Sequence, residues 1–265
     1  TSTLNVGAAP TGAVLVGKHV YVPLDQGNAI AVINIAKSTL QGTIAVGSHP
    51  GLPVISADGR TALVSNSGDA TVSVIDTTSR VVTATIPVGG SPMRAAFGTG
   101  SQGQSYASQA FVPNSADGTV SIIDLGSNTV VATTKVTGPL SDAVASPALS
   151  TAGYSVFIAS KQGGSTSVVS IDQATGRIAR TSPLDGDDVP QVPVVLADGS
   201  AFVDPSGGFL QVQQMSKNYL GPETDVAAFT QGSVGAGALS PDGAWALFSS
   251  PKQQFFASAT YVSLM

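Results

Sequence analysis

Three aspartates recur at the same point of a repeated phrase, and they are the first residues in this sequence with a capacity for chemistry. Asp76, Asp124 and Asp172 each end an alternating apolar run and precede a polar turn. Several carboxylates brought together could bind Ca²⁺, which prefers oxygen ligands. An Asp at the start of a turn also accepts hydrogen bonds from the backbone N–H groups that follow it. Because the residue returns in unit after unit, we predict a structural role for all three.

Other catalytic arrangements do not occur in the sequence. The chain has 2 His and no Cys, which excludes Cys nucleophiles, disulfides and zinc–thiolate sites. The glycine-rich phrases at 98–103 and 232–237 do not lead into Gly-Lys-Ser/Thr, and there is no Gly-x-Ser-x-Gly turn. We therefore predict no catalytic residue, no metal ligand set and no cofactor.

The composition limits both the fold and the partners. The 265 residues are 42% hydrophobic and 10% charged, with 30 Gly and 16 Pro, which indicates many short strands joined by turns. The net charge of −5 repels phosphate backbones, so nucleic acid is not an expected partner. No apolar stretch reaches the roughly 18 residues of a transmembrane helix, and we expect no transmembrane segment. The chain starts at Thr1 without Met, which either removal of a signal peptide or trimming of a longer sequence would leave, and we expect an exported protein.

The aspartates lie in a repeat that must position them. Four phrases align on this residue: IAVINIAKSTLQGTIAVG around Asn34, TVSVIDTTSRVVTATIPVG around Asp76, TVSIIDLGSNTVVATTKVTG around Asp124 and SVVSIDQATGRIARTSPLDG around Asp172. Their spacings are 42, 48 and 48 residues, and an eroded fifth copy has Gln214 a further 42 residues on. A front half with an Asp-Gly turn, such as HPGLPVISADGRTALVSN, precedes the phrase and adds two strands. Each unit is therefore predicted to form four antiparallel strands.

A period of about 40 to 50 residues with four strands is typical of β-propeller blades. The sequence thus predicts an all-β fold, in which residues 1–265 form a single β-propeller domain of six four-stranded antiparallel blades. The C-terminal TYVSLM is predicted to be a third strand, and TLNVG at residues 3–7 matches TIPVG at 85–89. We expect residues 3–7 to supply the outer strand of the last blade and so to close the ring.

The segment ISADGRTALVSNSGDATVSVIDTTSRVVTATIPVGGSP resembles the YVTN-type β-propeller repeat of bacterial and archaeal surface-layer and periplasmic proteins. The likeness is strongest over residues 47–138, and the name-giving dipeptide survives only as VYV at 20–22. Many members of that family have seven blades, whereas this chain has room for six. The resemblance implies a WD40-like repeat protein that is secreted, periplasmic or at the cell surface.

In propellers of this kind, the connections between blades gather at one mouth of a central channel, where ligands bind. The resemblance therefore implies that the residues just before each inner strand surround that mouth. Most of them are small or apolar, so the polar and long side chains stand out. The predicted ligand-binding residues are His49, Met93, Arg94, Asp142, Asp185, Asp187, Asp188 and Gln191.

Two groups within this set have alternative interpretations. Arg94 and Asp142 occupy equivalent positions in neighbouring blades, where they would form a salt bridge or an Arg fork that binds a ligand carboxylate or phosphate. The acidic loop that contains Asp185, Asp187 and Asp188 is either solvated or a Ca²⁺ site, although it lacks the spacing of a known calcium loop.

The function predicted from the sequence is a monomeric, non-catalytic scaffold of the bacterial cell envelope or extracellular space. Its channel-mouth loops would present a binding surface to a protein or a small-molecule ligand. The alternative is a metal-dependent lactonase or lyase with a cation in the channel, which would need inward Asp, Glu, Asn or His residues from several blades. A further alternative is an accessory to a redox enzyme, because propellers often dock electron-transfer partners.

Overall fold

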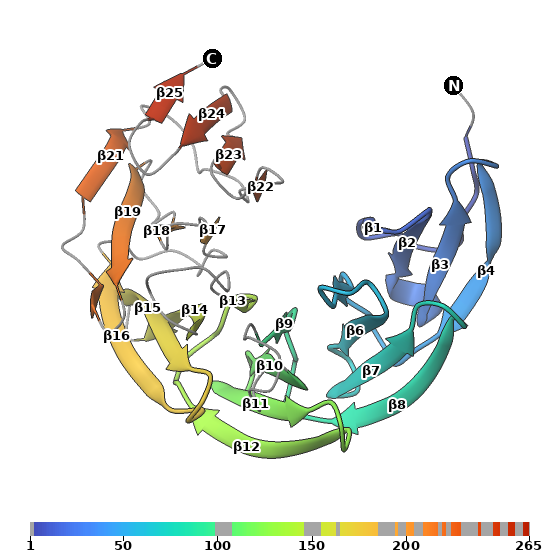
Figure 1. The fold of residues 1–265 in the computed structure, drawn as a ribbon, viewed down its shortest axis with the longest axis horizontal. Coiled ribbons are helices and arrows are strands. Elements are labelled where there is room, and N and C mark those ends of the chain that lie inside the picture. The colour runs from blue at the N-terminus through green and yellow to red at the C-terminus, as the bar shows by residue number, and fades with distance from the viewer. Residues whose placement is uncertain are drawn as a thin grey trace.

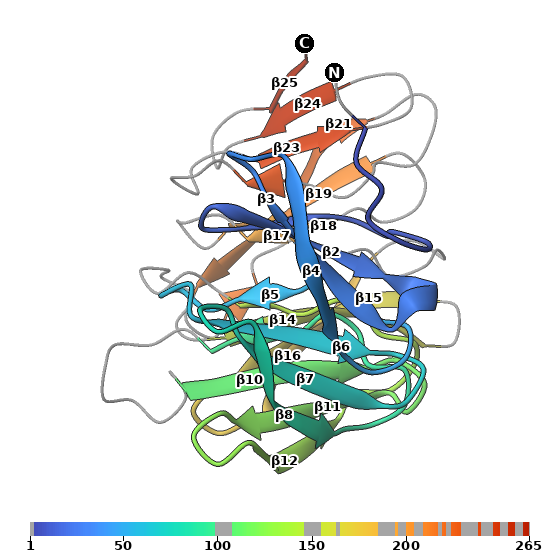
Figure 2. The same cartoon turned by 90° about the vertical axis from the view of Figure 1, so that its right-hand side faces the viewer.

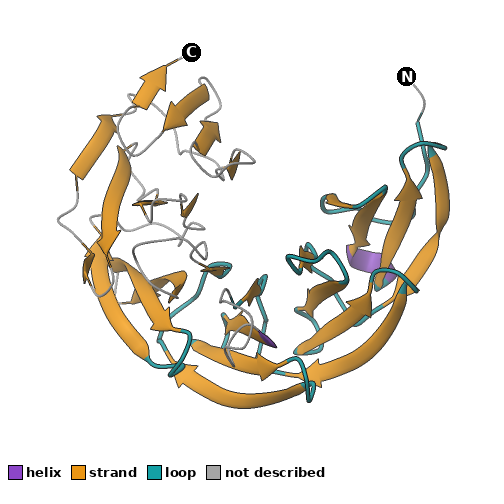
Figure 3. Cartoon of the chain, in the orientation of Figure 1, coloured by secondary structure: helices purple, strands orange, loops and turns teal. Residues whose placement is uncertain are grey.

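The computed structural model describes residues 3–98, 108–145, 155–162 and 165–184, together with the further strands given below. Nearly all of its regular structure is β-strand (Figure 3), and the named 3₁₀ helix η1 spans only Asp25–Gly27. The described strands form six antiparallel sheets, of which five have four strands and one has five. The predicted all-β fold of four-stranded antiparallel sheets is thereby confirmed.

The first three sheets contain the strands of the best-conserved sequence repeats. The first sheet consists of β1 (Val14–Val16), β2 (His19–Leu24), β3 (Ala29–Asn34) and β4 (Thr39–Ala45). The second consists of β5 (Val54–Ile55), β6 (Thr61–Asn66), β7 (Thr71–Asp76) and β8 (Val81–Pro87). The third consists of β9 (Ala96–Phe97), β10 (Gln109–Asn114), β11 (Thr119–Asp124) and β12 (Thr129–Lys135).

The remaining three sheets follow in chain order. The fourth consists of β13 (Val144–Ala145), β14 (Ser155–Gln162), β15 (Ser165–Asp172) and β16 (Ile178–Leu184). The fifth consists of β17 (Val194–Val195), β18 (Ser200–Val203), β19 (Phe209–Ser216), β20 (Tyr219–Leu220) and β21 (Thr224–Ala228). The sixth consists of β22 (Ala238–Leu239), β23 (Ala246–Ser249), β24 (Gln254–Ala257) and β25 (Val262–Leu264).

The sheets are arranged one after another around an arc (Figure 1). First strands such as β9 and β13 lie toward its centre, and fourth strands such as β12 and β16 lie on its outside. In a view turned by 90°, the outer strands β4, β8 and β12 follow one another along the surface (Figure 2). The described connections from β4 to β5, from β8 to β9 and from β12 to β13 therefore run from the outside of the arc to its centre.

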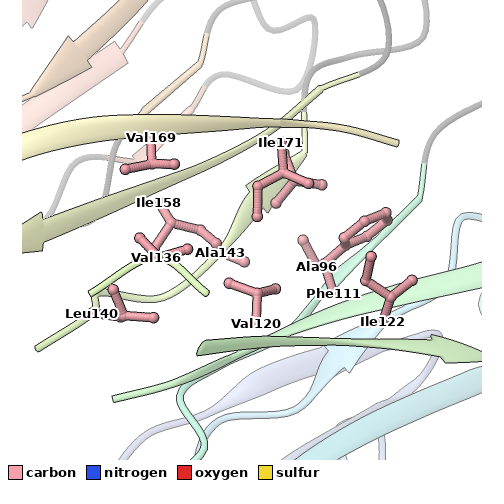
Figure 4. Close-up of a cluster of buried hydrophobic side chains, with 11 residues drawn as sticks. Ala96, Phe111, Val120, Ile122, Val136, Leu140, Ala143, Ile158, Val169 and Ile171 are labelled. Carbon is pink, nitrogen blue, oxygen red and sulfur yellow. The ribbon is translucent and has the colours of Figure 1, made fainter. Parts of the chain in front are cut away.

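The middle strands of the second and third sheets are buried on both faces because each of these sheets packs against two neighbouring sheets. Successive side chains of a strand point to opposite faces. In β10, Ala110 and Val112 join a core cluster with Leu63 of the second sheet. Phe111, which lies between them in sequence, joins the next cluster with Ile158 of the fourth sheet (Figure 4). This explains why consecutive residues of β6, β7, β10 and β11 are buried, whereas the outer strands β4, β8 and β12 are largely exposed.

A β-bulge recurs at one point of the outer strand in the first four sheets. Between β7 and β8 the register shifts after Val74, so that Thr83 has no partner residue on the neighbouring strand. Equivalent shifts occur between β3 and β4, β11 and β12, and β15 and β16. The pair β19 and β21 also has a shift, at a different point, after Leu210. Because a bulge bends and twists the strand that carries it, the outer strands curve around the arc.

The last sheet differs from the expected closure of the ring. Within TYVSLM, Val262–Leu264 forms the fourth strand β25, not the predicted third strand. The reason is a short hairpin that pairs Phe255 of β24 with Leu264. Residues 3–7 belong to none of the described strands, and the two chain ends lie on either side of the opening of the arc (Figure 1).

Candidate functional site

The connections that enter the first four sheets have the same backbone geometry. Each contains an isolated antiparallel bridge to the last residues of the second strand, and these bridges are Pro10–Leu24, Pro50–Asn66, Pro92–Asn114 and Leu140–Ser160. The next residue then donates a backbone hydrogen bond to that strand, and these bonds are Thr11–Pro23, Gly51–Ser65, Met93–Pro113 and Ser141–Ala159. The alignment of these four units in the sequence is therefore correct to the residue.

One position further on, the side chains diverge. We call these residues the strand-head residues, and they are Gly12, Leu52, Arg94 and Asp142. The Leu52 side chain fills the space beside Gly12, where an added Cβ would lie 2.6 Å from Leu52 Cδ2. Across the next boundary, Arg94 Nη2 donates a 3.3 Å hydrogen bond to the carbonyl oxygen of Pro53. Neighbouring strand heads therefore contact one another around the inside of the arc.

Arg94 and Asp142 meet through the backbone of Arg94. The Arg94 N–H donates a 3.0 Å hydrogen bond to Asp142 Oδ1, and the Ala143 N–H donates another of 3.0 Å to the Arg94 carbonyl oxygen. No ion pair joins the guanidinium to the carboxylate, so the predicted salt bridge is wrong. The cause is direction: the Arg94 side chain extends to Pro53 in the preceding sheet, whereas Asp142 comes from the following sheet.

The electrostatic environment of Asp142 disfavours its charge. Burial raises the pKa of its carboxyl group above the usual value, since the charged form loses solvation. The backbone hydrogen bond from Arg94 and the positive charge of the Arg94 guanidinium oppose this shift without cancelling it. Asp142 therefore has less compensation for its charge than an ion-paired carboxylate would have.

Two other predicted site residues have local partners. Met93 contacts the second sheet through its backbone, because its carbonyl oxygen accepts a 2.7 Å hydrogen bond from Ser65 Oγ. His49 Nδ1 lies 3.0 Å from Asp25 Oδ1, and both side chains are substantially exposed. His49 thus links the connection between β4 and β5 to η1, the turn between β2 and β3 of the first sheet. No hydrogen bond or ion pair joins it to Arg94 or Asp142.

The rest of the predicted set lies outside the described residues. These residues are Asp185, Asp187, Asp188 and Gln191. Within the part of the chain that the structure describes, no three His, Asp or Glu side chains come together in a group that could hold a metal ion.

The recurring aspartates are turn residues, as predicted. Asp76 Oδ1 accepts backbone hydrogen bonds from Thr78 and Ser79, at 2.9 and 2.7 Å. Asp124 accepts a 2.7 Å bond from the Ser127 N–H, and Asp172 accepts one of 2.8 Å from Thr175. These backbone bonds, together with bonds from the Ser hydroxyl groups, lower the pKa of Asp76 and Asp124, because they stabilise the charged form.

Sequence reasoning missed a second repeated pair at the same end of the sheets. Asn66 and Asn114 are fully buried, and each Nδ2 donates to two hydroxyl groups of the third strand. Asp69 and Asp117 accept backbone hydrogen bonds of 2.9 and 2.7 Å from Ser48 and Gly90, which lie in the connection that leads into their own sheet. The phrases NSGDAT at 66–71 and NSADGT at 114–119 carry the signal, since Asn and Asp return there at the same spacing.

Comparison with known proteins bears on the fold only. No family model matches the sequence, and no curated protein matches it. Among solved structures, the chain is similar to "Kuenenia stuttgartiensis Hydrazine Synthase", with a TM-score of 0.76 and 17% sequence identity. That match covers 97% of this chain and 79% of the other chain. Among the described residues, no helix has the length and apolar character needed to cross a membrane.

Proposed function

We propose that this chain is a non-catalytic β-propeller of six blades that binds a protein or small-molecule ligand at the mouth of its central channel. The six antiparallel sheets, arranged in an arc with their first strands toward the centre, support this architecture. The first and last sheets would meet to complete the ring. We further propose that it works in the bacterial cell envelope or the extracellular space, as the YVTN-type resemblance implies.

The strand-head residues carry the binding proposal. Four connections share one backbone geometry, yet the next side chain changes from Gly12 through Leu52 and Arg94 to Asp142. A residue required for folding would be repeated, as the turn aspartates are. Variation at a fixed, central and partly exposed position is what a binding site needs, because a rigid scaffold then presents different chemistry at each point.

The test is ligand capture with two variants that each remove one arginine, one at the channel mouth and one at the opposite end of the sheets. Immobilised full-length protein is incubated with envelope extract and culture supernatant, and the bound species are identified by mass spectrometry. Arg94→Met changes a strand head, and Arg60→Met removes the same charge from the opposite, exposed turn of the second sheet. Binding that is lost only in Arg94→Met supports the proposal. Retention of the bound species by both variants would place binding elsewhere and overturn it.

The enzyme alternative has one observation in its favour, which is the incompletely compensated carboxylate of Asp142 at a strand head. If the channel held a divalent cation, excess EDTA would lower Tm and added Ca²⁺ would restore it, because a metal that binds the native state stabilises it by mass action. The proposed function predicts no shift. A shift that disappears in Asp142→Asn or Asp187→Asn would establish a metal site and favour a lactonase or lyase.

A further inference from the structure

The guanidinium of Arg94 has hydrogen-bonding capacity that the described residues leave unused. Its side chain is half-buried, and its Nη2 donates to the Pro53 carbonyl oxygen, a neutral acceptor. Its Nε is fully buried and has no hydrogen-bond partner, although an arginine offers five N–H donors. Leaving a buried donor unpaired costs about 1–3 kcal/mol, and more for a charged group, so the guanidinium is poorly compensated by its surroundings. Its Nη1 has no hydrogen bond among the described residues and is not among their fully buried unpaired atoms, so it can donate to an acceptor from solvent.

The carboxylate of Asp142 is in the complementary situation. Its Oδ1 accepts the Arg94 N–H at 3.0 Å, and Oδ2 has no hydrogen bond among the described residues. No ion pair neutralises its negative charge within the described part of the chain. Asp142 remains partly exposed, so its free oxygen can be reached from solvent.

The two groups have opposite charges and are held next to each other without being paired. The Arg94 N–H and the Ala143 N–H fix the two strand heads by hydrogen bonds in both directions across the sheet boundary. The guanidinium extends one way and the carboxylate is bound by the main chain, so neither can neutralise the other without breaking these contacts. A ligand with its own positive and negative groups a few bonds apart would satisfy both.

We propose that Arg94 and Asp142 form a subsite for a small zwitterion, an α-amino acid, free or at the end of a peptide. The ligand carboxylate accepts hydrogen bonds from the guanidinium, which binds planar carboxylates well, and the ligand ammonium group donates to Asp142. This subsite deepens the proposed function, on which it rests, by naming the class of ligand that the strand heads recognise. Bacterial envelope proteins meet such ligands as free amino acids and peptides.

The experiment screens the protein α-amino acids one at a time at millimolar concentration against the full-length chain by thermal shift, with calorimetry for any that raise Tm. A ligand that binds the native state raises Tm by mass action. For each amino acid that binds, the matched probes are the carboxylic acid without the amino group and the amine without the carboxylate. We expect the zwitterion to bind at least tenfold more tightly than either probe.

The variants separate the two contacts. Arg94→Met should abolish binding of the amino acid, and Arg94→Lys should weaken it because the charge remains without the planar fork. Asp142→Asn keeps an oxygen for the Arg94 N–H but removes the negative charge. It should therefore reduce the affinity for the zwitterion at least tenfold and should not weaken binding of the carboxylate probe, from which it removes a like charge. Asp124→Asn is its matched control, since Asn34 already performs the same turn role in the first sheet.

The outcomes distinguish this subsite from the broader proposal. If no amino acid binds, or if Arg94→Met and Asp142→Asn bind as the wild type does, the zwitterion subsite is overturned. Capture of a protein through the strand heads would then still support the binding propeller. If an amino acid binds through both residues but NMR detects its conversion to a product, the subsite holds and the non-catalytic function fails.

Discussion

Gly138→Ala is a sharp test of how the connections between sheets are packed. Gly138 lies between β12 and β13 with a φ of +72°, and a Cβ added there would overlap the backbone carbonyl oxygen of Lys161. Gly59, in the turn between β5 and β6, has nearly the same φ of +73°, and an added Cβ would meet nothing within 4 Å. The two glycines therefore share backbone strain and differ only in the contact.

The magnitudes follow from this difference. A left-handed conformation costs a non-glycine residue about 1–2 kcal/mol. Restriction of the unfolded chain by alanine offsets roughly 0.4–1 kcal/mol of that. Gly59→Ala should thus lower the free energy of unfolding by about 1 kcal/mol. Gly138→Ala must also shift the backbone near Lys161, and such overpacking adds about 1–3 kcal/mol.

Urea denaturation followed by circular dichroism measures both variants, with the midpoint interpreted only if the slope is unchanged. The expected order of stability is wild type, then Gly59→Ala, then Gly138→Ala. Equal losses in the two variants would refute the reasoning, because they would show that the contact with Lys161 contributes nothing. The substitution Gly138→Ala should also affect ligand binding, since the connection that it displaces leads directly to Asp142.

Three further predictions concern the core and two carboxyl groups. Phe111→Ala should lower the free energy of unfolding by about 3–5 kcal/mol in urea, because it empties a fully buried site between the third and fourth sheets. Hydrogen bonds, first of all the one from the Ser79 N–H, lower the pKa of Asp76, so its stabilising effect is present above the unfolded pKa of about 3.8 and is lost as pH falls through the folded pKa. The Tm gap between wild type and Asp76→Ala should therefore narrow in acid, and a gap that is constant with pH would contradict this. The raised pKa of Asp142 has the opposite sign, because its destabilising charge appears as pH rises through the folded pKa. Asp142→Asn should therefore raise Tm at neutral pH and match the wild type below the unfolded pKa, whereas a lower Tm at neutral pH would refute the burial argument.

The repeat made most of the fold predictable from the sequence. Alternating apolar residues identify each strand, and the spacing of Asp76, Asp124 and Asp172 sets the register of the units. The turn role of these residues was predictable because an Asx side chain needs only its own neighbours to form its hydrogen bonds. The last sheet was harder, since its repeat is eroded and two pairings of TYVSLM satisfy the same alternation.

The candidate site was predictable in position but not in contacts. Arg94 and Asp142 occupy equivalent positions in the repeat, which predicts that they are neighbours, and they are neighbours in the structure. Which atoms meet depends on side-chain direction, and no sequence pattern states that the Arg94 guanidinium extends toward Pro53. The pairing of His49 with Asp25 was missed for a similar reason, because those residues come from different repeat units at positions that are not equivalent.

The recurring bulge of the outer strands affects whether copies of this chain associate through the edges of their sheets. β8 has no charged side chain, and its Val81 is 55% exposed, so the outer edge of the second sheet is the kind of surface that recruits another strand. The shift at Thr83 interrupts the row of hydrogen-bonding groups that a foreign strand would need. The equally uncharged β4 carries the same irregularity, so in both strands we expect the bulge to oppose edge-to-edge association in place of the surface charges that usually do so.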